Sequence, residues 1–312
     1  MSDICLVTGG AGFIGSHLVE ALARQGRPVR VLDDLSTGLQ ANLAHVQPAP
    51  EILEGDVGDA AAVHRAMNGV GVVFHLAALA SVQRSVEKPE DTHRVCATGT
   101  LNVLDAARRA GVRRVVYAAS SSAYGIPHGD VQTERDPLQP LSPYAAAKLA
   151  GELYAQSFTA TYGLETVRLR FFNIFGPRQR ADSPYSGVIA LFTAALTAGR
   201  TPIIFGDGLQ SRDFTFVTDV VQALTRAAEA PGVSGQVYNI GTGRATNLLE
   251  LVAALNRQLG TNIAPQLAPS RAGDVRHSRA DIAAARRDLG YEPSIAFEDG
   301  LAQTLNWYRQ QI

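Results

Sequence analysis

Tyr144 and Lys148 lie four residues apart, at the start of a segment, residues 145–162, that is predicted to form a long helix. Side chains at positions i and i+4 share one face of a helix, so the phenol and the ammonium can reach the same ligand. A tyrosine pKa of ~10 must fall by about three units before the phenol acts as a base near neutrality, which is worth ~4 kcal/mol. One cation ~4 Å away supplies roughly that amount at an effective dielectric constant of ~20. We therefore predict proton transfer through Tyr144 with Lys148 lowering its pKa; a helix-surface aromatic is the alternative.

A glycine-rich segment, TGGAGFIG at residues 8–15, follows a short apolar run and precedes apolar residues at helical spacing. This order predicts strand, tight turn and helix. Glycine allows positive φ in the turn and lets a phosphate approach amide donors at the helix N-terminus. The next predicted strand, residues 29–32, ends in Asp33-Asp34, where a carboxylate can accept from both ribose hydroxyls of an adenosine. Together these features predict a dinucleotide site. Asp33 favours NAD over NADP, because a carboxylate repels a 2′-phosphate, and a bound positive nicotinamide ring would help Lys148 to lower the pKa of Tyr144.

The elements that must position these residues alternate along the first half of the chain. Strands are predicted at residues 4–7, 29–32, 51–54, 70–76, 115–118 and 166–171, with helices that include residues 89–110 and 145–162. Alternation of this kind predicts an α/β fold with a Rossmann-type doubly wound parallel sheet and right-handed crossovers. Beyond Phe171, glycines and prolines become frequent and the strands shorten. We expect a dinucleotide-binding domain at residues 1–170 and a smaller α/β substrate lobe at residues 171–312, with about 214–240 returning to the first domain.

Two further strand ends carry candidate cofactor contacts. Asp56 and Val57 follow the third predicted strand, and the small residues at 77–78 follow the fourth. In a doubly wound sheet the carboxyl ends of the strands face the ligand crevice. Asp56 can therefore meet the adenine amino group, and a plain helix-capping role for Asp56 or Asp59 is an equal alternative. The small residues would let pyrophosphate and ribose lie against the backbone.

The composition is that of an ordinary soluble globular protein. The 312 residues are 46% hydrophobic and 18% charged, with a formal net charge of -1. No basic excess indicates nucleic acid or an anionic membrane as a partner, and no apolar run approaches the length of a membrane span. Cys5 and Cys96 fall inside predicted elements, so we expect buried thiols in a reducing cytosol. We expect a cytoplasmic protein without a metal, because no metal-ligand spacing is present, and we interpret the scattered histidines as structural.

Three features together resemble the extended short-chain dehydrogenase/reductase family: the glycine-rich segment, the serines at 120–122 before Tyr124-Gly125, and Tyr144-x-x-x-Lys148. The resemblance covers essentially the whole chain. It implies that Ser120 and Tyr144 contact the reacting oxygen, that Lys148 holds the nicotinamide ribose, and that Ser122 is a further substrate contact. It also implies an NAD site formed by Gly9, Gly12, Phe13, Ile14, Gly15, Asp33, Asp34, Asp56, Val57, Leu76, Ala77, Ala78, Tyr144, Lys148 and Phe171.

Segments of the second half resemble the nucleotide-sugar 4-epimerases: RFFNIFGPRQ from residue 170, SGVI from residue 186, GDG and SRDF between residues 206 and 214, and RAGDVRHS from residue 271. Arg212 and Arg271 are two cations suited to a diphosphate, because arginine forks match phosphate oxygens; solvated surface charges are the alternative. The resemblance implies substrate contacts at Ser81, Ser120, Ser122, Tyr144, Asn173, Gly187, Val188, Phe205, Arg212, Arg271, Asp274 and Ser278.

The serine loop bears on the type of reaction. Family members that dehydrate or decarboxylate a nucleotide sugar need an additional acid or base, typically a carboxylate in this loop, and residues 120–124 read SSSAY. We therefore expect oxidation and reduction at one carbon only. Tyr144 would take the C4 hydroxyl proton while C4 gives hydride to NAD, and the transient 4-keto sugar would turn over and receive the hydride on its other face. Such a cycle consumes no cofactor, so tightly held NAD is expected.

Ser278 bears on the substrate. In the 4-epimerases the residue four after the aspartate of R-x-G-D borders the sugar's C2 substituent, where tyrosine accompanies plain hexoses and small residues accompany N-acetylated ones. A serine leaves volume for an acetamido group, and the surrounding sequence most resembles the bacterial UDP-N-acetylglucosamine 4-epimerases. We expect C4 epimerisation of UDP-N-acetylglucosamine. UDP-glucose or UDP-uronate 4-epimerase activity is the nearest alternative, a dehydratase or net dehydrogenase ranks below it, and an NAD-sensing binding protein ranks last.

The resemblance also implies a homodimer in which the helices after Pro89 and after Tyr144 pack as a four-helix bundle. The alanines at 145–147 and Ala150 would allow close helix approach, and the same alanines could instead belong to the core.

Overall fold

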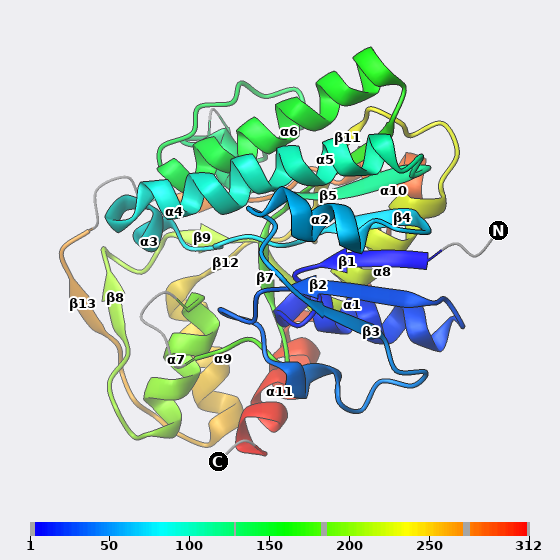
Figure 1. The fold of residues 1–312 in the computed structure, drawn as a ribbon. Helices are drawn as coiled ribbons and strands as arrows, with labels where there is room; N and C mark the ends of the chain where they lie inside the picture. Colours follow the sequence, from blue (N-terminus) through cyan, green and yellow to red (C-terminus); the bar gives the residue numbers. More distant parts are fainter. Residues whose placement is uncertain (1–3, 128, 182–185, 271–274, 311–312) are drawn as a thin grey trace.

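A computed structural model describes residues 4–127, 129–181, 186–270 and 275–310. Its centre is a seven-stranded parallel sheet with strand order β11-β6-β5-β4-β1-β2-β3 (Figure 1). The strands are β1 Ile4–Thr8, β2 Val29–Asp33, β3 Glu51–Glu54, β4 Val70–His75, β5 Arg114–Ser120, β6 Glu165–Phe171 and β11 Val237–Ile240. The predicted doubly wound sheet is therefore confirmed. The strand order reverses between β1 and β4, which is where such sheets open a crevice at their carboxyl ends.

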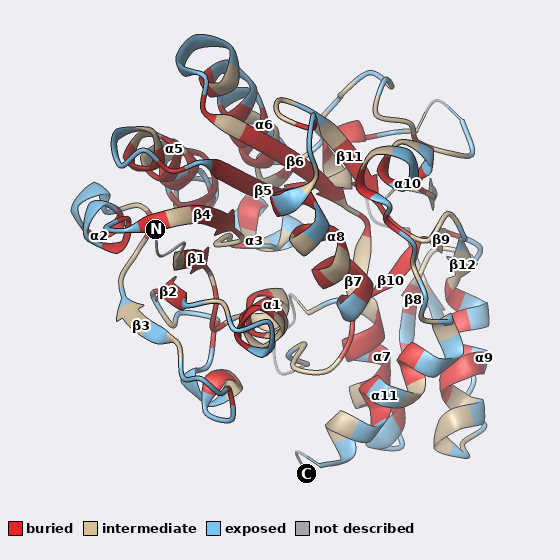
Figure 2. Ribbon diagram, turned by 90° about the vertical axis from the view of Figure 1, so that its right-hand side faces the viewer, coloured by how far each residue is buried: buried red, intermediate tan, exposed pale blue. Residues whose placement is uncertain are grey.

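Helices cover both faces of the sheet (Figures 1 and 2). One face packs against α2 Ala60–Ala66, α5 Gly99–Arg109 and α6 Pro143–Tyr162. The other face packs against α1 Phe13–Arg24, α8 Val217–Glu229 and α10 Ala283–Leu289. Because both faces are covered, the central strands are apolar nearly throughout, and Figure 2 shows them almost entirely buried. Residues 217–240 supply α8 and then β11, which pairs with β6.

A second apolar cluster lies beside the sheet, at the lower left of Figure 1. Its helices are α7 Val188–Thr197, α9 Leu248–Leu259 and α11 Phe297–Arg309. They pack around short strands rather than a large sheet: β7 Asn173–Phe175, β8 Ile203–Phe205, β9 Ser211–Arg212, β10 Phe214–Phe216, β12 Thr246–Asn247, β13 Gln266–Ala268 and β14 His277–Ser278. In the described part of the chain, none of the helices has the length and apolar character needed to cross a bilayer.

Several element boundaries differ from the predicted ones. α6 begins at Pro143 rather than at residue 145, because the Ser142 hydroxyl accepts a hydrogen bond from the Ala145 amide (3.2 Å) and Pro143 occupies the first turn, where its missing N–H costs nothing. Tyr144 therefore lies inside the first turn. Similarly, α1 begins at Phe13, directly after the glycine turn.

The predicted helix at residues 89–110 is interrupted. It consists of α4 Pro89–His93, one π-helical turn at Arg94–Thr98 and then α5, and the separate short helix α3 Val82–Glu87 precedes it. The Thr100 hydroxyl donates to the Cys96 carbonyl (2.6 Å) within this irregular stretch. Apolar periodicity is nearly the same for α- and π-helical turns over so short a distance, so the sequence pattern could not show the interruption.

Candidate active site

The glycine-rich turn after β1 admits no residue larger than glycine at two positions. Gly9 has φ +71, and a Cβ there would lie 2.8 Å from the Ala77 amide nitrogen. A Cβ on Gly15 would lie 2.0 Å from the Gly9 carbonyl oxygen. Gly12 caps α1 without a side-chain hydrogen bond, so the first-turn amides of α1 receive no side-chain acceptor. This cradle fits the pyrophosphate of a dinucleotide.

Asp33, at the end of β2, fastens this turn. The residue is 7% exposed, and its carboxylate accepts from the amides of Ala11 and Leu35, each at 2.9 Å. Burial raises the pKa of Asp33, while these two amide hydrogen bonds oppose the rise. Asp34 is exposed and accepts from the hydroxyl of Ser36 (2.6 Å). A carboxylate has further lone pairs, so Asp33 can accept from a ribose hydroxyl, as predicted, while it keeps its two hydrogen bonds with the backbone.

The two aspartates after β3 have separate roles. Asp59 is the N-cap of α2 and accepts from the Ala61 amide (2.9 Å). Asp56 instead accepts from the Gly58 amide (2.7 Å) and forms an ion pair with Arg94. Of the two open alternatives, helix capping therefore belongs to Asp59, and contact with adenine remains a prediction for Asp56. The neighbouring Val57 is buried, and its carbonyl accepts from Asn102.

The predicted contacts after β4 lie directly against the glycine turn. The Leu76 amide donates to the Thr8 carbonyl (3.1 Å), and the Ala77 amide donates to the Thr8 hydroxyl (3.3 Å). Ala78 and Tyr144 both pack against a small apolar cluster of Cys96, Ala97 and Ala147. The carboxyl ends of β1 and β4 are thereby tied together beside the predicted catalytic tyrosine.

Ser120, Ser122 and Tyr144 meet at the end of β5. The hydroxyls of Ser120 and Ser122 lie 2.8 Å apart. Burial raises the pKa of Tyr144 well above its ordinary value, the neighbouring Cys96 thiol adds to the rise, and a hydrogen bond with Ser120 lowers it. The expected lowering of this pKa is therefore wrong for the protein's own groups, because burial outweighs them. The contribution of a bound positive ring stays a prediction.

Lys148 lies one turn further along α6 and is only 3% exposed. Burial lowers the pKa of Lys148 to about 8, while the Cys96 thiol and the Glu152 carboxylate oppose this shift. Its Nζ lies 4.4 Å from the centroid of the Tyr117 ring. The sequence indicated the helical spacing of Tyr144 and Lys148 but not the aromatic ring beneath the ammonium.

A buried polar network that includes Glu152 of α6 was missed at the level of sequence. Arg170 Nε donates to Glu152 Oε2 (3.0 Å), Arg170 Nη1 donates to the Tyr124 hydroxyl (2.9 Å), and that hydroxyl donates to Asn239 Oδ1 (2.6 Å). The side chains of Arg170 and Glu152 are each 3% exposed. Arg170 and Tyr124 belong to segments that resemble the family, RFFNIFGPRQ and Tyr124-Gly125. That resemblance was the only sequence feature that pointed to the network.

Several predicted substrate residues come together on a small three-stranded sheet. Ser278 on β14 is the register partner of Arg212 on β9. Arg212 donates to the carbonyl of Ser211 (2.9 Å), and it is partly exposed. Asn173 lies near them, because its amide donates to the carbonyl of Asp213 (3.0 Å). The predicted contacts Arg271 and Asp274 lie outside the described residues.

Asp213 is a residue that the sequence reasoning passed over. Its buried carboxylate accepts from the amides of Thr242 (2.8 Å), Gly243 (2.9 Å) and Ala280 (3.1 Å). Burial raises the pKa of Asp213, and the hydrogen bonds from Thr242, Ala280 and Gly243 oppose the rise. The carboxylate thus holds the segments on either side of Arg212 together. The sequence feature that could have pointed to this role is the position of Asp213 directly after Arg212.

The other predicted contacts are placed as follows. Gly187 is the N-cap of α7 and Val188 its first residue. Phe205 ends β8, and its carbonyl accepts from Gln210 (2.6 Å). Ser81 is the N-cap of α3 and accepts from the Arg84 amide (3.1 Å). Phe13 and Ile14 pack toward the second apolar cluster, and Phe171 packs against the core of the sheet.

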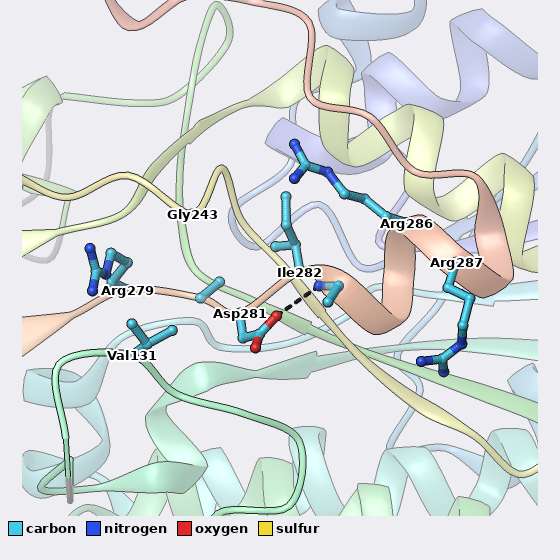
Figure 3. Close-up of a pocket in the computed structure, with 9 residues that line it drawn as sticks. Val131, Gly243, Arg279, Asp281, Ile282, Arg286 and Arg287 are labelled. Atoms are coloured by element: carbon cyan, nitrogen blue, oxygen red, sulfur yellow. Dashed lines mark hydrogen bonds between the residues drawn. The ribbon is translucent and has the colours of Figure 1, made fainter.

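A surface pocket lies between α10 and the loop at Val131 (Figure 3), and its lining includes Gly243 and Ala280, whose amides donate to Asp213. Its polar residues include Arg286, which pairs with Glu292, and Arg287, which pairs with Asp288. Asp281, which also lines it, accepts from the Ala283 amide (2.8 Å), the bond drawn as a dashed line in Figure 3. Asp281, Arg286 and Arg287 are thus partnered within the protein, and Arg279 is the remaining charged residue of the lining. The glycine turn with Ser120, Tyr144 and Lys148 is the better candidate for the active site. Among the described residues, no group of three or more histidine, cysteine, aspartate or glutamate side chains could hold a metal ion.

Comparison with known proteins agrees with this geometry. The family model described as the NAD dependent epimerase/dehydratase family matches residues 5–241. A UDP-glucose 4-epimerase of Mycolicibacterium smegmatis is 43% identical over 315 residues, covering 98% of each chain. The structure of a UDP-N-acetylglucosamine 4-epimerase from Methanobrevibacter ruminantium superposes with a TM-score of 0.95 at 36% identity, covering 100% of both chains. A UDP-glucose 4-epimerase from Thermus thermophilus, solved with NAD, superposes with a TM-score of 0.90 at 36% identity, covering 99% of this chain and 100% of that one.

Proposed function

The chain belongs to the NAD dependent epimerase/dehydratase family, and on that premise we propose that it interconverts the C4 epimers of a UDP-hexose, with UDP-N-acetylglucosamine preferred. One observation carries this proposal. Tyr144, hydrogen-bonded to Ser120, shares the start of α6 with the buried Lys148 and packs against the same apolar cluster as Ala78, whose neighbour Ala77 meets Gly9 of the glycine cradle. A base, a cation and a phosphate cradle are thereby gathered at one crevice.

Each of these residues has a distinct task. The cradle of Gly9, Gly12 and Gly15 holds the pyrophosphate of NAD, and Asp33 accepts from its adenosine ribose. The bound cofactor would supply hydride transfer at C4 of the sugar. Tyr144 takes the proton of the C4 hydroxyl and later returns it, while Ser120 orients the same oxygen. Lys148 holds the nicotinamide ribose and contributes positive charge that favours the phenolate.

The serine loop limits the reaction to this step. Dehydration or decarboxylation requires a further acid or base, and Ser120, Ser122 and their neighbours at 121–124 offer hydroxyls only. Of the three carboxylates in the following loop, Asp130 is exposed and Asp136 accepts from the Thr133 hydroxyl (2.6 Å). The third is Glu134, whose Oε1 accepts from the Asn239 amide (2.8 Å). It is thereby engaged in the buried network rather than in the crevice. Epimerisation through a transient 4-keto sugar is what the remaining groups support.

The substrate assignment depends on Arg212 and Ser278. As register partners on adjacent strands, they bring a diphosphate-binding cation beside a small side chain. The small serine supports an acetamido group at C2. The alternative is UDP-glucose or a UDP-uronate, and related proteins bear names of both kinds, a UDP-glucose 4-epimerase and a UDP-glucuronate 4-epimerase among them.

The assembly and location of the enzyme follow from the same resemblance as proposals. A cytoplasmic homodimer would pack α5 and α6 against their copies. Leu153 and Tyr154 of α6 are 55% and 40% exposed, and Ala146 is exposed, which supports this surface. Ala145 and Ala147 are buried in the chain itself and belong to its core. Sedimentation velocity of the purified protein tests the dimer, and Leu153→Glu should shift it to the monomer.

The activity test compares turnover of UDP-glucose, UDP-N-acetylglucosamine and their uronates. Tyr144→Phe should abolish epimerisation of every substrate, and full activity in that variant would overturn the assignment of the base. Ser278→Tyr should lower kcat/KM for the N-acetylated substrates while sparing UDP-glucose. Equal effects on both substrates would leave the epimerase assignment intact and remove the basis for the N-acetyl preference.

A further inference from the structure

We infer that Tyr117 is a positioning residue for Lys148, holding the ammonium over its ring so that the lysine stays charged in a dry crevice. The inference rests on the proposed role of Lys148. Nζ of Lys148 lies 4.4 Å from the ring centroid of Tyr117, within the range of a cation–π contact. Both side chains are buried, with Tyr117 fully inaccessible and Lys148 3% exposed.

Tyr117 is fixed at its hydroxyl end against α6. It stands on β5, three residues before Ser120, and its hydroxyl donates to the backbone carbonyl of Lys148 (3.0 Å). A Cβ on Gly151 would lie 2.4 Å from the Tyr117 hydroxyl oxygen, so α6 admits the phenol only because residue 151 is glycine. The ring therefore contacts both the backbone and the ammonium of the same lysine.

His75 supports the ring from β4. The two rings are stacked, with centroids 5.6 Å apart. Thr100 donates its proton to the Cys96 carbonyl (2.6 Å), so its oxygen accepts from His75 Nε2 (2.9 Å), which leaves Nδ1 to accept from the Thr8 hydroxyl (2.7 Å). Burial, then the charge of Lys148, lowers the pKa of His75 to about 3. The imidazole is therefore neutral and does not repel the lysine.

The charges around Lys148 explain why an aromatic ring is needed to stabilise its ammonium. Burial disfavours the ammonium, whereas the Cys96 thiol and the Glu152 carboxylate favour it. Cys96 is a buried thiol whose own pKa is raised by burial, and Glu152 is already paired with Arg170, so neither offers Lys148 a dedicated counter-charge. The negative face of an aromatic ring stabilises a cation without adding a charge or a proton of its own. Tyr117 can thus stabilise the ammonium without competing for the proton.

The experiment measures the pH profile of kcat/KM, because activity should fall as pH rises through the pKa of Lys148. Tyr117→Phe keeps the ring and should keep the high-pH limb, although it loses the hydroxyl bond. Tyr117→Leu removes the ring and should move that limb down by about one pH unit. Tyr238→Leu is the matched control, since Tyr238 is a buried tyrosine on β11 and its hydroxyl donates to Asp288 (3.2 Å), away from the lysine. It should lose stability without moving the limb.

If Tyr117→Leu fails to fold, a series of fluorinated phenylalanines at position 117, which keep the shape of the ring, still tests the inference. Phenylalanine with one, two and three ring fluorines at position 117 weakens the ring's negative face stepwise at nearly constant volume, so the limb should move down with each fluorine. A limb that stays fixed along the series would overturn the inference. Lys148→Ala separates this result from the proposed function: if that variant keeps wild-type activity, the role of Lys148 itself is wrong, whatever Tyr117 does.

Discussion

Nη2 of Arg178 lies 2.5 Å from Oε2 of Glu20, although the two residues are 158 positions apart. Arg178 follows β7, and Glu20 lies on α1, the helix that begins at the glycine turn. Arg178 has a φ of 66, a conformation that non-glycine residues seldom adopt, and its guanidinium also reaches His45 (3.1 Å). The ion pair thus joins the loop that leads toward α7 to the helix that would hold the pyrophosphate.

Glu20→Gln should weaken the dependence of the unfolding free energy on pH in the acidic range. Burial favours the neutral acid, but hydrogen bonds from Arg178 and His45 prevail and lower the pKa of Glu20 to about 2 from 4.5. A lowered folded-state pKa contributes stability above pH 4.5 that is lost as pH falls toward 2. After allowance for solvent screening, we expect the variant to be about 1 kcal/mol less stable at pH 7, with the difference vanishing near pH 2. Urea unfolding against pH measures this, with Glu229→Gln of an exposed pair as control.

Gly15→Ala should damage the cofactor cradle. Because its Cβ would lie 2.0 Å from the Gly9 carbonyl oxygen, the turn must shift, and we expect a loss of about 1–3 kcal/mol in unfolding free energy together with much weaker NAD binding. Gly129→Ala is the matched control, since Gly129 is exposed and a Cβ added there would meet no atom within 4 Å. NAD titration and urea unfolding test both. Wild-type NAD affinity in Gly15→Ala would contradict the proposed cradle.

Arg170→Met should be strongly destabilising, since it leaves the Glu152 carboxylate buried without its partner. Breaking such a pair from one side costs about 3–5 kcal/mol, whereas replacing both residues by methionine should recover much of the loss. Arg109→Met serves as the comparison, because Arg109 pairs with Asp105 but is 62% exposed, and should cost less than about 1 kcal/mol. Guanidinium unfolding of the four proteins measures these differences; a small loss in Arg170→Met would mean that the network contributes little.

His75→Gln should reduce the loss of unfolding free energy that occurs as pH falls. The pKa of His75 is lowered to about 3 from 6.5 by burial, so the folded protein resists protonation while the unfolded chain accepts it. Stability should therefore be full above pH 6.5 and fall with decreasing pH, by about 1.4 kcal/mol per pH unit, until the folded histidine also titrates. The variant should lack this slope, although it starts from a lower value. His64→Gln, at an exposed position, should keep the wild-type slope.

The sequence determined those features that depend on neighbours within a few residues. The strand, glycine turn and helix at β1 and α1, the ends of the parallel strands, and the spacing of Tyr144 and Lys148 all follow from local patterns. Glycine at 9 and 15 and the apolar strands leave few other conformations, which is why the doubly wound sheet could be predicted. The resemblance of later segments to the 4-epimerases identified Arg212 and Ser278. It could not show that they lie opposite each other on neighbouring strands.

Tertiary structure decided the features that depend on contacts between distant segments. The ring of Tyr117 meets Lys148 from another element, Asp213 gathers amides from residues 242, 243 and 280, and β11 reaches β6 from far along the chain. The pKa of Tyr144 rises because it is buried, a consequence of all the chain around it that i and i+4 spacing cannot convey. Spacing places a phenol and an ammonium on one helix face; only the packed fold sets the dielectric in which they act.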